Sequence, residues 1–103
     1  MKPLTFLQYQ TEVQNYPGSV ILFFTAPWAV NQAVKTQDFL KSINLNVKLF
    51  SVDFDSEPEL VEKFSVRFVP ILYAIQNGTV KNLSMKCENQ DDFYYLLGKE
   101  SKK

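Results

Sequence analysis

The chain has 103 residues, 46% of them hydrophobic and 15% aromatic, which is typical of one globular domain spanning residues 1–103. Eleven basic and eleven acidic side chains give a formal net charge of zero, so nucleic acid and anionic membrane surfaces are poor candidate partners. Histidine is absent and cysteine occurs once, which excludes histidine-based acid–base catalysis, Cys-His nucleophiles, the usual zinc sites and an intramolecular disulfide. We therefore expect neither a metal nor a cofactor.

The hydrophobic runs are too short for a membrane span. The longest, Val20 to Phe24, fits a buried strand, and the N-terminus lacks the long apolar stretch of a signal peptide. We therefore expect a cytoplasmic protein.

The first half of the chain predicts a helix, a strand and a second helix. Apolar residues three or four positions apart indicate an amphipathic helix from Thr5 to Tyr16, with Thr5 as its cap. Ser19 to Thr25 is a continuous apolar and β-branched run, as expected for a strand that is covered on both faces at the centre of a sheet. Helical spacing returns from Asn31 to about Ile43, and Asn44 can end that helix.

The next segment predicts a second strand followed by a short helix. Val47 to Phe54 is apolar enough for a strand. After it, Ser56 and Glu59 have the spacing of a capping box, with Pro58 in the first turn, which predicts a helix to about Phe64.

The last third of the chain predicts a hairpin and a final helix. Pro70 to Gln76 and Thr79 to Met85 flank Asn77-Gly78, a strong hairpin signal, so these two strands must be antiparallel. Asn89 can cap a last helix that Gly98 closes.

Two polar features give only weak indications of a reactive thiol or of carboxylate catalysis. Cys87 is most simply an incidental, hydrophobic cysteine, although Lys86 and the following helix start offer a weak version of the setting that activates a thiol. Asp53 and Asp55 lie two residues apart at a strand end, but no partner base accompanies them for carboxylate catalysis.

Several motifs in this order resemble those of the thioredoxin family. A central strand leads into Thr25-Ala-Pro-Trp28 and a helix, and Val66-Arg-Phe-Val69-Pro70 precedes a strand, the Asn77-Gly78 hairpin and a last helix. The resemblance covers nearly the whole chain. It implies an α/β fold of three layers, a mixed central sheet flanked by helices, and a cis peptide bond before Pro70.

The residues that carry thioredoxin redox chemistry are missing as a set. In the family's Ala-x-Trp-Cys-Gly-Pro-Cys segment, the two cysteine positions fall here on Ala29 and Gln32. The family's buried acid and nearby lysine would fall at Phe23 and Ser51, and two of its glycines are replaced by Phe68 and Lys86. Because thiol–disulfide exchange needs a thiolate at the attacking position, the resemblance implies a protein that is not an enzyme.

Because these redox residues are missing, our hypothesis is that the region around the former redox site is a binding surface. In relatives, the loop before the proline presents its backbone to an extended peptide, and that role needs no sulfur. The expected binding residues are Trp28, Val30, Asn31, Phe68, Val69 and Pro70. Alternatively, Trp28 and Phe68 fold onto the body of the domain and fill space that glycines would leave.

The function that we expect is a redox-inactive, thioredoxin-like module that binds a protein or peptide without covalent chemistry. One alternative is a thiol-dependent redox accessory that uses Cys87 or a partner's thiol. Another is a structural subunit whose apolar face is buried in a homodimer.

Overall fold

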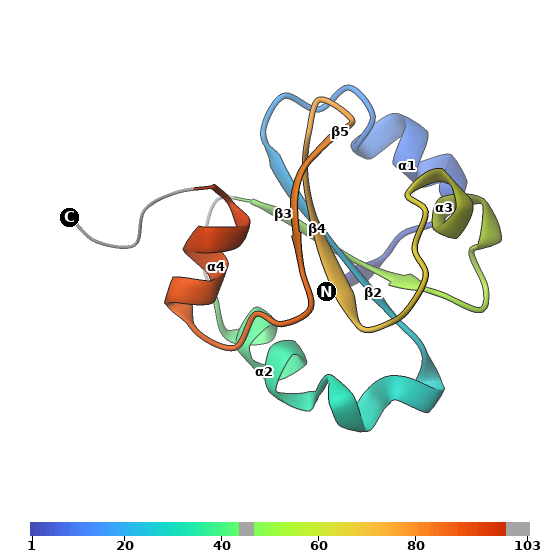
Figure 1. The fold of residues 1–103 in the computed structure, drawn as a ribbon. Helices are drawn as coiled ribbons and strands as arrows, with labels where there is room; N and C mark the ends of the chain where they lie inside the picture. The colour runs from blue at the N-terminus through green and yellow to red at the C-terminus, as the bar shows by residue number, and fades with distance from the viewer. Residues whose placement is uncertain (44–46, 99–103) are drawn as a thin grey trace.

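The computed structural model describes residues 1–43 and 47–98, which form a central sheet between two layers of helices (Figure 1). The elements in chain order are β1 (Lys2–Pro3), α1 (Phe6–Glu12), β2 (Ser19–Thr25), the 3-10 helix η1 (Pro27–Gln32), α2 (Val34–Ser42), β3 (Lys48–Asp53), α3 (Pro58–Lys63), β4 (Ile71–Gln76), β5 (Thr79–Ser84) and α4 (Gln90–Leu96). The predicted order of elements is confirmed, with β1 and η1 added.

The sheet is mixed, as expected, and its five strands are ordered β1-β3-β2-β4-β5. β1, β3 and β2 are parallel to one another, whereas β4 is antiparallel to both β2 and β5. β2 occupies the centre, and residues 20–24 within it are all buried because helices cover both faces of the sheet. β1 has only two residues, too few for an alternating pattern to reveal it in the sequence.

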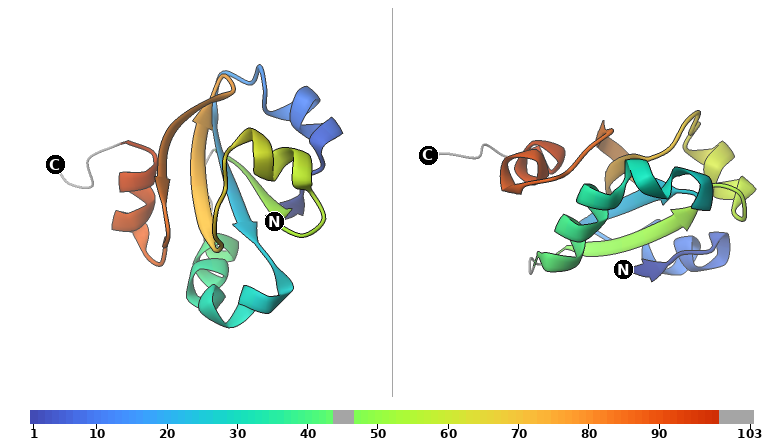
Figure 2. Two further views of the ribbon diagram at one scale, coloured as in Figure 1. Left: turned by 45° about the vertical axis from the view of Figure 1, so that its right-hand side comes forward. Right: turned by 90° about the horizontal axis from the view of Figure 1, so that it is seen from below.

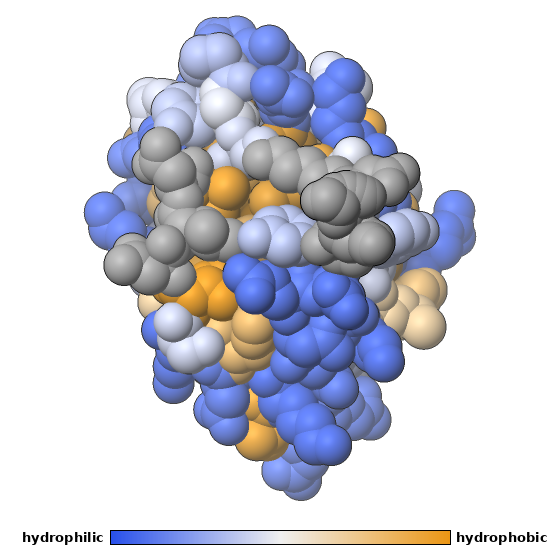
Figure 3. Space-filling view, turned by 90° about the vertical axis from the view of Figure 1, so that its left-hand side faces the viewer, coloured by the Kyte–Doolittle hydropathy of each residue, from blue (hydrophilic) through white to orange (hydrophobic). Residues whose placement is uncertain are grey.

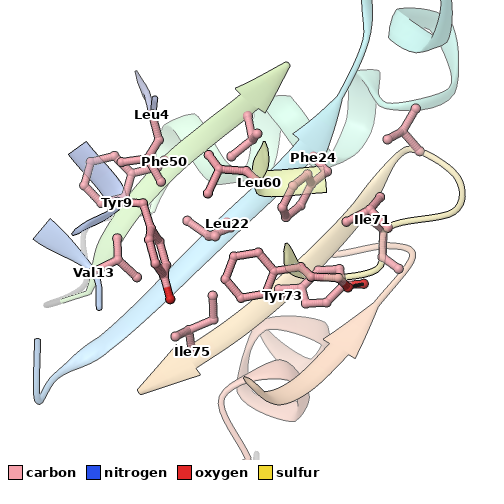
Figure 4. Close-up of a cluster of buried hydrophobic side chains, with 14 of the residues drawn as sticks. Leu4, Tyr9, Val13, Leu22, Phe24, Phe50, Leu60, Ile71, Tyr73 and Ile75 are labelled. Atoms are coloured by element: carbon pink, nitrogen blue, oxygen red, sulfur yellow. Dashed lines mark hydrogen bonds between the residues drawn. The ribbon is translucent and has the colours of Figure 1, made fainter. Parts of the chain in front are cut away.

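One face of the sheet packs against α1 and α3 around a cluster of aromatic rings (Figures 2 and 4). The ring centroids lie 5.6 Å apart for Tyr9 and Phe64, 6.1 Å for Phe24 and Phe64, and 5.4 Å for Phe24 and Tyr73. The Tyr73 hydroxyl donates a hydrogen bond of 3.0 Å to the backbone oxygen of Phe64, so this buried polar group is satisfied.

The other face packs against α2 and α4. Its buried side chains include Phe23, Leu72, Cys87 and Phe93. Figure 3 turns the α4 side toward the viewer and shows hydrophilic residues over most of the lower half, with smaller hydrophobic areas between them. Because Phe23 packs among these buried apolar side chains, it is part of the core on this face of the sheet.

The predicted caps and turns are largely confirmed. Thr5 caps α1 in a capping box with Gln8, and the Asn89 side chain accepts a hydrogen bond from the Asp92 backbone at the start of α4. The Asn77-Gly78 turn has positive φ at both residues, 54° and 76°, as a tight hairpin turn requires.

Two predicted boundaries were wrong. α1 ends at Glu12 rather than Tyr16, whose backbone oxygen accepts a hydrogen bond from Asn77 in the hairpin turn. The helix predicted from residue 31 is divided into η1 and α2 at Ala33, where the 3-10 helix ends, and Val34 is exposed. The predicted end at Asn44 lies outside the described residues.

The capping box predicted at Ser56 does not form. The Ser56 hydroxyl donates to Asp53 at 3.0 Å, and Glu57 holds the N-cap position of α3 without a side-chain hydrogen bond. The turn that closes β3 therefore competes successfully for the serine hydroxyl.

Candidate binding surface

The predicted binding residues lie on two segments that meet at one end of the sheet. β2 runs directly into η1, which carries Trp28 and Val30, and the segment with Phe68 runs into β4. In the antiparallel pair of β2 and β4, Phe24 lies opposite Ile71, so the end of β2 lies beside the start of β4 (Figure 1). The topology therefore brings both segments to the same end of the sheet.

Three large apolar side chains on these segments are exposed to solvent. The exposed fraction is 64% for Trp28, 50% for Phe68 and 48% for Val30. Asn31 is exposed as well. These exposures favour the surface interpretation of the two aromatic residues over the alternative that they fill the interior, because a core ring is nearly free of solvent contact.

Val69 differs from its exposed neighbours, and the expectation that its side chain joins the exposed apolar face is wrong. Its side chain is 7% exposed and packs in the cluster under α1 and α3. The Val69-Pro70 peptide bond is cis, as predicted, and Pro70 is half-buried. Val69 therefore anchors the loop in the core, and Phe68 is the residue that the loop presents to solvent.

Trp28 is exposed but held in place. Its indole nitrogen donates a hydrogen bond of 3.0 Å to the Asp55 carboxylate, and its ring meets the Phe54 ring edge-on, with centroids 6.3 Å apart. A ring fixed in this way loses little conformational freedom when it contacts a partner. The sequence singled out Asp55 as an acid but not as the partner of Trp28, because the two are 27 positions apart.

The acidic pair at the end of β3 stabilises a turn. Asp53 accepts one hydrogen bond from the Asp55 backbone nitrogen and one from Ser56, each of 3.0 Å. Asp55 is engaged by Trp28. Both carboxylates thus have structural partners.

The two positions that the resemblance matches to the family's cysteines differ in accessibility. Ala29 is fully buried, and its backbone nitrogen donates to Ala26 within η1, whereas Gln32 is exposed. A methyl group and an amide at these positions offer neither a thiolate nor a nucleophile.

Cys87 lies in the core under α2 and α4. Its side chain has no solvent exposure, and its backbone nitrogen donates a 3.3 Å hydrogen bond to the buried Thr36 hydroxyl. Burial, with a smaller contribution from the charge of Asp92, raises the pKa of the Cys87 thiol to about 12. The thiol is therefore protonated at neutral pH, as in a cysteine that serves packing.

Within residues 1–43 and 47–98, no three or more Cys, Asp or Glu side chains gather where they could hold a metal ion. In the same part of the chain, no helix is long and apolar enough to cross a membrane.

Comparisons with known proteins agree with this architecture. The Thioredoxin family model matches residues 1–97. The thioredoxin of Fasciola hepatica has a similar structure, with a TM-score of 0.74 and 23% identity over 95% of this chain and 97% of that one. A designed protein matches with a TM-score of 0.70 and 20% identity over 94% of this chain and 88% of its own. Among curated proteins, none matches this sequence.

Proposed function

We propose that this chain, which belongs to the thioredoxin family, is a redox-inactive module that binds a protein or peptide segment without covalent chemistry. The observation that carries the proposal is the pair of exposed aromatic residues, Trp28 and Phe68, at the end of the sheet where Ala29 stands in place of a cysteine. Exposed apolar groups that gather at one place commonly mark contact surfaces, and aromatic anchors contribute much of their binding energy.

The backbone beside Phe68 supports an extended partner. Among the described residues, the backbone N–H groups of Arg67, Phe68 and Val69 donate to no other group of the protein. Phe68 and Val69 lie in a bend that leads into β4, and unpaired backbone donors beside a strand are groups to which a peptide can add. The segment therefore offers hydrogen bonds to a partner's backbone beside an aromatic side chain.

The two alternative functions make different demands on the molecule. A redox accessory role for Cys87 requires an accessible thiolate, and both the burial of this thiol and its raised pKa weigh against that role. In a homodimer, a second copy of the chain would cover the same exposed face. The molecular mass in solution therefore distinguishes a homodimer from a monomer that binds another protein.

The test replaces Phe68 with aspartate. Linear peptides are first selected from a random library on the wild-type protein, and their affinities are then compared with those for Phe68→Asp. Loss of a central aromatic anchor typically costs about 2 kcal/mol or more, so we expect binding to weaken at least about tenfold. The matched control is Leu7→Asp, which places the same charge at a side chain on α1 that is 72% exposed, and it should leave affinity unchanged.

Three readouts decide between the interpretations. Both variants should melt close to the wild type, because exposed substitutions change stability by about 0.5 kcal/mol or less. Unfolding of Phe68→Asp alone would show that the ring belongs to the core, and unchanged peptide affinity would place the contact surface elsewhere. A wild-type dimer that becomes monomeric in Phe68→Asp would identify a second copy as the partner.

A further inference from the structure

A pocket that Trp28 and Phe68 do not line lies where β2 and β3 end, and η1 and α2 contribute to its lining. Its volume is about 260 Å³. That exceeds the roughly 150 Å³ of a cavity that holds benzene and is slightly below the roughly 300 Å³ of the smallest usual ligand sites. The pocket therefore suits a small molecule or a single side chain.

The register of the sheet explains why polar side chains line this pocket. Thr25 lies opposite Asp53, and Ser51 lies opposite Phe23, which packs under α2. Because side chains alternate between faces, Ser51 and Asp53 share the face that α2 covers, and Thr25 shares it as well. Gln37 of α2 lines the pocket together with these three residues.

The polar side chains that line the pocket have hydrogen-bonding groups without a partner in the described residues. Asp53 already accepts two hydrogen bonds, yet a carboxylate offers about four acceptor positions. In the part of the chain that the structure describes, the side chains of Thr25, Ser51 and Gln37 make no hydrogen bond to another residue. The pocket thus presents one negative charge and several unused acceptor oxygens, while Pro27 and Val30 provide an apolar wall.

We propose that this pocket binds a primary alkylammonium group. Asp53 is the single charged residue among the described residues that line the pocket, so an anion would meet repulsion without a compensating Lys or Arg. An ammonium group has three donors and no acceptor, which matches a site rich in acceptor oxygens. Pro27 and Val30 would contact the methylene groups of the ligand. The proposal goes beyond the peptide-binding function, since it does not depend on Trp28 or Phe68.

The probe is n-butylammonium, titrated into the isotope-labelled protein near neutral pH while its backbone amides are followed by NMR. Matched controls are n-butanol and n-butyrate, which have similar chains but are neutral and negative. We expect saturable shifts at the amides of Thr25, Gln37, Ser51 and Asp53 with the ammonium alone. Because charge-assisted hydrogen bonds are about twice as strong as neutral ones, Asp53→Asn should weaken binding at least about tenfold.

A second variant keeps the test independent of the turn that Asp53 stabilises. Ser51→Val leaves that turn intact and replaces a hydroxyl with methyl groups that reduce the pocket, so it should also weaken n-butylammonium binding while the fold is retained. Equal shifts with n-butanol, binding of n-butyrate, or absence of shifts at these four amides would each overturn the proposal.

The ammonium group can belong to a free amine or to a lysine side chain of another protein. A blocked Gly-Lys-Gly peptide carries the same butylammonium group on a backbone. Shifts of the same amides by the peptide would support a protein-borne lysine as the ligand. Shifts by n-butylammonium alone would support a small free amine.

Discussion

The Cys87 thiol should react far more slowly in the folded protein than in the unfolded chain. The raised pKa, about 12 against an ordinary value of 9.0, lowers the thiolate fraction near pH 8 about a thousandfold, and only the thiolate is nucleophilic. Complete burial of the side chain adds a steric barrier to any reagent. We therefore expect the alkylation rate of the native protein to be at least about a thousandfold below that of the unfolded protein.

The assay follows iodoacetamide modification by mass spectrometry, in buffer and in guanidinium chloride at the same pH. The single cysteine makes the product unambiguous, and Cys87→Ala serves as the blank. A native rate within about tenfold of the unfolded rate would contradict the buried, protonated thiol, and would restore Cys87 as a candidate for redox chemistry.

The same pKa shift predicts how stability depends on pH. The unfolded chain loses the thiol proton near pH 9, whereas the folded protein retains it until about pH 12. The unfolded state then binds fewer protons, so the free energy of unfolding falls as pH rises above 9, by roughly 1 kcal/mol per pH unit. Denaturant titrations between pH 8 and 10 should show this fall in the wild type and a weaker one in Cys87→Ala.

Three further predictions concern the remaining structure. The double variant Ala29→Cys/Gln32→Cys should be a weak disulfide reductase at best in turnover assays, because neither an acid nor a lysine stands at the two assisting positions. Gly78→Ala should lower the free energy of unfolding by at least about 1 kcal/mol more than Gly98→Ala, which denaturant titration would measure. Both glycines have φ of 76°, but only at Gly78 would a Cβ lie 2.6 Å from a backbone oxygen. Tyr73→Phe should cost about 1 to 3 kcal/mol in the same titration, because it leaves the buried carbonyl that the hydroxyl contacts without a partner.

Elements with a clear periodicity could be predicted from the sequence. The continuous apolar run from Ser19 to Thr25 marked the central strand, and Asn77-Gly78 marked the hairpin, because the physical requirement in each case is local. Boundaries that depend on tertiary partners could not be predicted. The hydrogen bond that the Ser56 hydroxyl donates to Asp53 replaced the expected cap of α3, since two local arrangements competed for one hydroxyl.

The candidate site was only partly predictable for a similar reason. The family resemblance predicted that Trp28 and Phe68 lie near each other. Their exposure to solvent could not be predicted, because it depends on how η1 and the loop before β4 pack. The Phe68 side chain is exposed and that of its neighbour Val69 is buried. Two adjacent apolar residues are too few to show a periodicity, so the sequence could not indicate which of them faces the core. The pocket beside Ser51 and Asp53 arises from the pairing of β2 with β3, which is not local in sequence.

Disulfide turnover by the wild-type protein tests the central claim most directly. With insulin as substrate and dithiothreitol as reductant, we expect a rate equal to that of a control without protein, because Ala29 supplies no attacking thiolate and Cys87 is buried. Turnover clearly above the control, retained in Cys87→Ser, would contradict a redox-inactive function for this chain.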